Sequence, residues 1–262
     1  MYSLIQCEFL KLRKSKFYLI IILMTCCYPL LVFFKNISES NLLNWNQYIF
    51  SVENMSFIIT FTPIFCLISA YIFSREFSYK TSQILFCYPQ SRTKIFISKL
   101  ITIMVLFAFL LFLELLVTIL LGFMCPHEVL TSQIIYIHFK LYLYVLFVEC
   151  TISPICILIS LLFKNTVTPL IYGILISVCN LFISTYFVVK NANGGLMKNI
   201  IFNIPLFYNV PILYSCFKAN NGKAIFIESS SILSLHHIFI CILTFIIANL
   251  FCILYYKKLE VK

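Results

Sequence analysis

The sequence predicts an all-α membrane protein with six transmembrane helices, and three observations support this. The chain has 262 residues, of which 62% are hydrophobic and only 11% charged, whereas soluble domains carry about a quarter charged residues. The apolar residues form six runs of roughly the length that crosses a bilayer. Each run is expected to be helical, since a segment in lipid must satisfy its own backbone polar groups. This composition excludes an ordinary soluble enzyme, a disordered chain and a secreted disulfide-rich domain.

We expect a single transmembrane domain, 1–262, with spans near residues 17–34, 57–73, 100–124, 141–163, 166–189 and 238–256. Residues 1–16 precede them as an interfacial helix, and 74–99 form a polar cytoplasmic loop. Residues 190–237 are external. Their apolar part is interrupted by Pro205 and Pro211, so it is too short and broken to span and is expected to be re-entrant or interfacial.

Basic residues set the predicted orientation. With the N-terminus inside, 13 of the 19 Lys and Arg residues lie in cytoplasmic segments, so both termini are expected to be cytoplasmic. The net charge of +10 follows from the same bias and does not indicate a nucleic-acid partner.

The N-terminal segment has helical periodicity. One stripe carries Glu8, Lys11 and Lys14, and the other holds the apolar residues Tyr2, Ile5, Phe9 and Leu12. This pattern predicts an amphipathic helix with its basic side toward anionic lipid. A stop-transfer flank without defined geometry is the alternative.

The loop after the second span is dense in polar residues. Arg75 and Glu76 open it, a short helix is expected over residues 81–86, and Pro89 ends that helix. The alternative is a solvated hairpin.

Two motifs resemble the ABC-2 family of ABC-transporter permeases, and within it the six-span permeases of bacteriocin and lantibiotic self-immunity exporters. The first motif is E-F-x-K-L-x-K/R-S, and the second runs from R-E-F/Y through T, P and S-R-x-K to a final Lys. Their residues here are Glu8, Phe9, Lys11, Leu12, Lys14 and Ser15, then Arg75, Glu76, Phe77, Thr81, Pro89, Ser91, Arg92, Lys94 and Lys99. Lys80 departs from the family pattern, in which Gly often precedes the Thr.

This resemblance implies an ABC-2 (type V exporter) transmembrane domain in which residues 81–88 form a coupling helix that docks on a separate ATPase. Glu76 and Arg92 would brace the loop, and the helix with Glu8, Phe9, Lys11 and Lys14 would support its flank. The implied ATPase-coupling residues are Arg75, Glu76, Thr81, Ser82, Pro89, Ser91, Arg92 and Lys94.

The implied function is ATP-driven export of an amphipathic or hydrophobic substrate, with antimicrobial-peptide self-immunity favoured, across a bacterial plasma membrane. The implied partners are two ATPase copies, which hold ATP and Mg, and a second permease subunit. The chain itself has no expected catalytic, cofactor or metal site: Phe217 stands where a phosphate-binding loop ending at Gly222-Lys223 would need Gly. The alternatives are a structural or sensory membrane subunit and an intramembrane enzyme, which is disfavoured because no expected span contains His or Asp.

Two glutamates interrupt apolar spans. Glu114 and Glu149 each lie fourteen residues from the expected inner end of their span, or about 21 Å at 1.5 Å per residue. They are therefore expected at one level, facing protein or a cavity. Their carboxyls either share a proton, attract a cationic substrate or simply bond to a neighbouring helix.

Other polar residues are expected near the outer surface. The four histidines, including His138, are interpreted as interfacial, and Lys140 is expected to reach the headgroups. A disulfide between Cys125 and Cys216 remains open, and the cysteines inside the spans are interpreted as small apolar residues.

Overall fold

The computed structural model describes residues 2–13, 15–39, 42–78, 91–190, 203–210, 212, 217–220, 223–226 and 235–258. Four residues with expected roles, Lys14, Thr81, Ser82 and Pro89, therefore lie outside the described residues, as does Cys216. The helices are α1 (Tyr2–Arg13), α2 (Lys16–Glu39), α3 (Trp45–Met55), α4 (Phe61–Ser78), α6 (Arg92–Phe123), α7 (Ser132–Phe163), α8 (Val167–Lys190) and α11 (Leu235–Lys258).

The predicted all-α fold with six transmembrane helices is confirmed. Within the described residues, six helical segments are long and apolar enough to cross a membrane: α2, the continuous segment Trp45–Ser78, α6, α7, α8 and α11. Several extend beyond the apolar runs from which spans were predicted. The second begins at Trp45 rather than near residue 57, because α3 buries one face, including Glu53, and continues the helix.

The segment Trp45–Ser78 contains one wide turn. The π-helix η1 (Ser56–Thr60) joins α3 to α4, and Pro63 follows it in the first turn of α4. Proline lacks the N–H that would bond the carbonyl four residues earlier, and single π-turns often mark functional positions inside helices. The wide turn therefore lies where the backbone ladder is already interrupted.

A small hairpin is the exception to the all-α prediction. Strands β1 (Phe217–Asn220) and β2 (Lys223–Phe226) pair antiparallel, with Phe217 opposite Phe226. The 3₁₀ turn η2 (Pro205–Phe207) precedes it. We call this side of the bundle the hairpin end.

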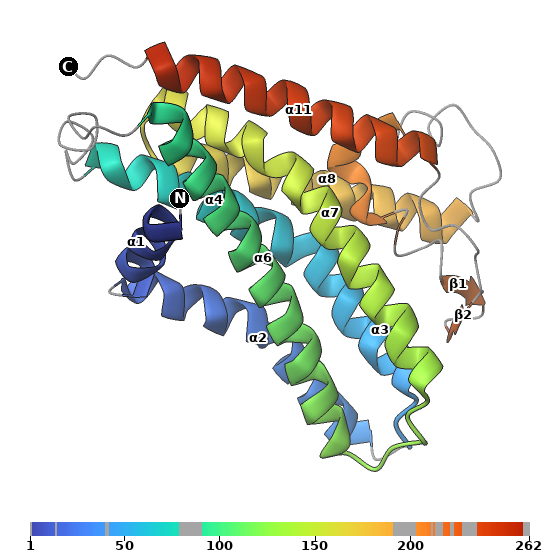
Figure 1. The fold of residues 1–262 in the computed structure, drawn as a ribbon. Coiled ribbons are helices and arrows are strands. Elements are labelled where there is room, and N and C mark those ends of the chain that lie inside the picture. Colours follow the sequence, from blue (N-terminus) through green and yellow to red (C-terminus); the bar gives the residue numbers. More distant parts are fainter. Residues whose placement is uncertain are drawn as a thin grey trace.

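The other end of the bundle holds α1 and the C-terminal end of α11 (Figure 1). We call it the α1 end. The segment ending in α4 is the most buried of the six, and it packs closely against α8, where Gly173 faces Pro63. A Cβ at Gly173 would lie 2.9 Å from the Pro63 Cα, so only glycine permits this approach of the two helices.

Trp45, the first residue of α3, attaches the start of this helix to α6 and to the link after it. Its indole N–H donates to the Glu128 carbonyl at 2.8 Å, and its ring lies where a Cβ on Gly122 of α6 would be. Leu43 and His127 form an isolated bridge beside it. The links before α3 and after α6 are thereby joined.

Candidate functional site

Helix α1, the link after it and the start of α2 each contact the end of α4. Arg75 Nη1 donates to the Lys11 carbonyl at 2.9 Å, in the last turn of α1. Ser15, in the link to α2, lies 3.0 Å from the Tyr71 hydroxyl, and the Phe17 ring stacks on Tyr71 with centroids 3.8 Å apart. Because a last-turn carbonyl has no partner within its helix, Arg75 also caps α1.

Four charged side chains meet where α1, α4 and α6 converge, and we call Glu8, Lys11, Glu76 and Lys99 the ionic cluster. The Lys99 ammonium lies 2.6 Å from a Glu76 oxygen and 3.7 Å from a Glu8 oxygen. It also donates to the Ile72 carbonyl at 3.1 Å. Lys11 closes the set at 2.6 Å from Glu8 and 3.8 Å from Glu76. Two acids and two bases balance in charge.

Burial makes Lys99 the centre of this cluster. Its side chain is 0% exposed, whereas that of Lys11 is 40% exposed. An ammonium so deeply buried is tolerable only with carboxylate partners and further hydrogen bonds, and Lys99 has both. It therefore holds the first turns of α6 against α1 and α4.

The cluster corrects the expected orientation of α1. The side with Glu8 and Lys11 was expected to face anionic lipid, but Glu8 is buried together with Leu12 of the expected apolar stripe. Tyr2, from the expected apolar stripe, is 74% exposed. The charges on α4 and α6 explain the difference, because Glu8 finds a buried cation there.

The first turn of α6 also contacts α11. Arg92 Nη1 donates to the Lys257 carbonyl at 2.7 Å. Tyr256 is buried against Phe73 and Phe96, with centroids 6.1 and 5.9 Å away, and its hydroxyl side faces Glu76. Ser91 and Lys94 are exposed at this edge. The structure thus places the described residues expected to couple to an ATPase at one end of the bundle.

Glu149 lies in a different kind of site. Its Oε1 accepts from the Thr62 hydroxyl at 2.8 Å and from the Asn209 amide at 2.7 Å. The same amide is 3.3 Å from the Phe57 carbonyl in the π-turn. All three side chains that meet here are buried. Asn209, from the segment between Pro205 and Pro211, therefore closes a gap between α7 and the wide turn.

Glu114 belongs to a separate group nearer the hairpin end. The Tyr142 hydroxyl donates to its Oε2 at 3.2 Å. Close by, His138 Nδ1 lies 2.8 Å from an oxygen of Glu53, and all four side chains are buried. His138, expected as an interfacial polar residue, is thus buried inside the bundle, where the carboxyl of Glu53 offers it a partner.

The expectation that Glu114 and Glu149 share one level is also wrong. Glu114 lies opposite Tyr142, which precedes Glu149 by seven residues of α7, or about 10 Å of helix rise. The depth estimate counted Glu114 from residue 100, the expected start of its span. Helix α6 instead begins at Arg92, about two turns earlier, so Glu114 lies farther from the start of α6 than Glu149 lies from the end of α7.

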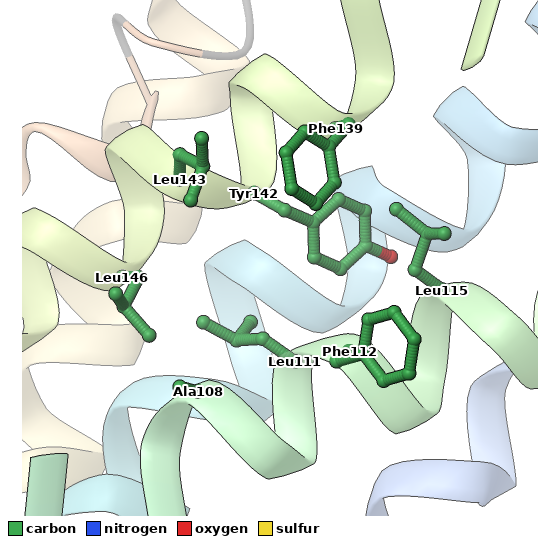
Figure 2. A pocket seen from close by; sticks show the side chains of 8 residues that line it. All are labelled: Ala108, Leu111, Phe112, Leu115, Phe139, Tyr142, Leu143 and Leu146. Atoms are coloured by element: carbon green, nitrogen blue, oxygen red, sulfur yellow. The ribbon is translucent and has the colours of Figure 1, made fainter. Parts of the chain in front are cut away.

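A lateral groove lies outside the Glu114 group. Residues of α6 and α7 line it, including Leu111, Phe112, Phe139 and Leu143, and its volume is about 210 Å³. Figure 2 shows the Tyr142 ring between these apolar side chains, with its hydroxyl directed toward α6. Tyr142 thus separates an apolar surface from the buried carboxyl behind it.

Sequence reasoning assigned no role to Lys99, Glu53 or Asn209. Lys99 was part of a recognised motif, and its position at the start of an apolar run was a usable indication of burial. Glu53 lies just before a predicted span. Asn209 lies between two prolines in an apolar segment, where a polar residue must find a partner if it is buried.

Known proteins give a consistent classification. A family model described as "ABC-2 family transporter protein" matches residues 4–180, which include α1, the ionic cluster, Glu114 and Glu149. The chain is also 30% identical over 138 residues to the bacitracin transport permease protein BCRB of Bacillus licheniformis. That match covers 51% of this chain and 65% of the relative. A multi-pass bundle of six apolar helices, matched over most of its length by this family, is a member of the ABC-2 family of transporter proteins.

Proposed function

We propose that this chain is the membrane subunit of an ATP-driven exporter and that a separate ATPase binds the segment between α4 and α6. The ionic cluster carries this proposal. Glu76 lies two residues before the end of α4, Lys99 lies in the second turn of α6, and the two side chains are bonded at 2.6 Å. A displacement of the segment between them would therefore move α4, α6 and α1 together.

Membership of the family supports the other subunits of the proposed transporter. Two ATPase copies would bind ATP and Mg, and a second permease subunit, identical or related, would complete the pathway. The α1 end would face the cytoplasm of a bacterial cell, with both termini inside, in line with the distribution of Lys and Arg. Alternation between inward-open and outward-open bundles would then expel the substrate.

The substrate we favour is an amphipathic antimicrobial peptide, with export conferring self-immunity. The name of the relative, a bacitracin transport permease, supports a peptide of this class. The apolar groove between α6 and α7 offers a surface for a lipid-soluble cargo. Survival of cells with and without this chain, on a panel of such peptides that includes bacitracin, tests this choice.

Affinity purification of the intact complex tests the coupling assignment. An ATPase should copurify, and deletion of residues 81–92 should detach it or abolish substrate-dependent hydrolysis. The matched control is deletion of the hairpin, residues 217–226, at the opposite end, which should leave the ATPase attached. Intact assembly and turnover after the first deletion would contradict the proposal and favour a structural or sensory subunit.

A further inference from the structure

Lys140 is a cation in an unusual position. It lies on α7, eight residues after the helix begins, and its side chain is half-buried. Among the residues that the structure describes, none forms a hydrogen bond or ion pair with its ammonium group. A basic side chain near a membrane boundary generally reaches toward polar partners, so the partner of this one is to be sought outside the described chain.

A groove lies directly beside Lys140. It is lined by Lys140, Leu143, Tyr144 and Phe147 of α7 and by Ile238 of α11, and its volume is about 340 Å³. Leu143 is 51% exposed at its edge, so the groove borders the surrounding lipid. A cation at one end of an apolar groove matches an amphiphile with a charged head and an apolar chain.

The depth of the groove fits a headgroup. About 20 helical residues cross the hydrocarbon core, so a helix of 32 residues such as α7 extends beyond it at its ends. Lys140 and Ile238, the fourth residue of α11, line the same groove and so lie near the same boundary. The first turn of α11 also presents the positive end of a helix dipole.

The charge of the groove selects among lipids. The described residues that line it include one lysine and no glutamate, so they offer no carboxylate partner for the ammonium of a zwitterionic headgroup. We propose that this groove binds an anionic phospholipid, with the phosphate on Lys140 and an acyl chain along Leu143 and Phe147. This site lies apart from the α1 end, and it shares only Leu143 with the groove between α6 and α7.

Native mass spectrometry of the full chain, with any subunits that copurify, tests the site. Phosphatidylglycerol and phosphatidylcholine with identical chains are titrated into the detergent-solubilised protein. Lys140→Gln should lower the preference for phosphatidylglycerol about fivefold, the factor for about 1 kcal/mol per basic residue near an anionic surface. Lys140→Arg should retain the preference.

Two further variants distinguish binding in this groove from a general attraction of anionic lipid to positive charge. Leu143→Trp fills the groove without removing the cation and should weaken phosphatidylglycerol binding. Lys258→Gln, at an exposed lysine on the opposite end of α11, should leave the preference unchanged. An unchanged preference in Lys140→Gln, an equal loss in Lys258→Gln, or undiminished binding in Leu143→Trp would overturn the proposal. Thermal unfolding confirms that each variant is folded. If Lys140→Gln is not folded, the results for Lys140→Arg and Leu143→Trp decide the test.

Discussion

Glu76 and Glu149 are both buried carboxyls of this bundle, and they are stabilised in opposite ways. Glu76 at the α1 end is paired with an ammonium group, and two more charges complete its cluster. Glu149, deeper in the bundle, accepts from a hydroxyl and an amide among the described residues. The charged cluster depends on each of its members, whereas the neutral donors around Glu149 suit a carboxyl or its amide analogue equally well.

The largest predicted effect comes from Lys99. Lys99→Met leaves Glu76 and Glu8 buried without their central cation, and removal of one member of a buried ion pair costs about 3–5 kcal/mol. Denaturant or thermal unfolding in detergent measures the loss. Lys258→Met is the control, since this exposed lysine should change stability by less than about 0.5 kcal/mol. Equal stability of the two variants would remove the distinction between the charged and the neutral site.

A smaller loss is expected at Asn209. Asn209→Ala removes the amide that serves both Glu149 and the Phe57 carbonyl, and buried groups left without partners cost about 1–3 kcal/mol. Asn249→Ala is the matched control, because that amide bonds only within its own helix, to the Phe245 carbonyl. If the control variant unfolds as readily as Asn209→Ala, the bridge from Asn209 to α7 is not stabilising.

The smallest effect on stability is expected at Glu149 itself. Glu149→Gln retains an oxygen that can accept from Thr62 and Asn209, so the change should stay below about 1 kcal/mol. Combined with Glu114→Gln, it then reports on function alone. Altered transport or substrate range would assign the carboxyls to the pathway. Unchanged transport and range would leave them a structural role.

The fold was largely predictable because apolar runs of bilayer length leave helices as the main solution. The boundaries were less predictable: Glu53 and His138 read as polar flanks until the structure pairs them. A pairing between residues 85 positions apart leaves no trace in hydropathy. The hairpin at residues 217–226 was missed for a related reason, since strands of four residues are too short to show an alternating pattern.

The candidate site was predictable only in part. The motifs located Glu8, Glu76 and Arg92 at one end, but they did not reveal that Lys99 lies between both glutamates. Helical periodicity assigned Glu8 to the lipid-facing side of α1, because it compares residues within one helix. The charges of neighbouring helices decided the outcome, and these become known only when the helices are packed.

The most direct test of the mechanical role is the double variant Glu76→Gln/Lys99→Met. It removes the central pair together and leaves Glu8 and Lys11 bonded to each other at 2.6 Å in the parent structure, so stability should recover relative to Lys99→Met alone. The measurement is the amount of peptide transported per ATP hydrolysed by the assembled complex. We predict that the complex still assembles and hydrolyses ATP but that this ratio falls severalfold. A stable double variant with the transport ratio of the parent protein would contradict the account and reduce the cluster to a structural support.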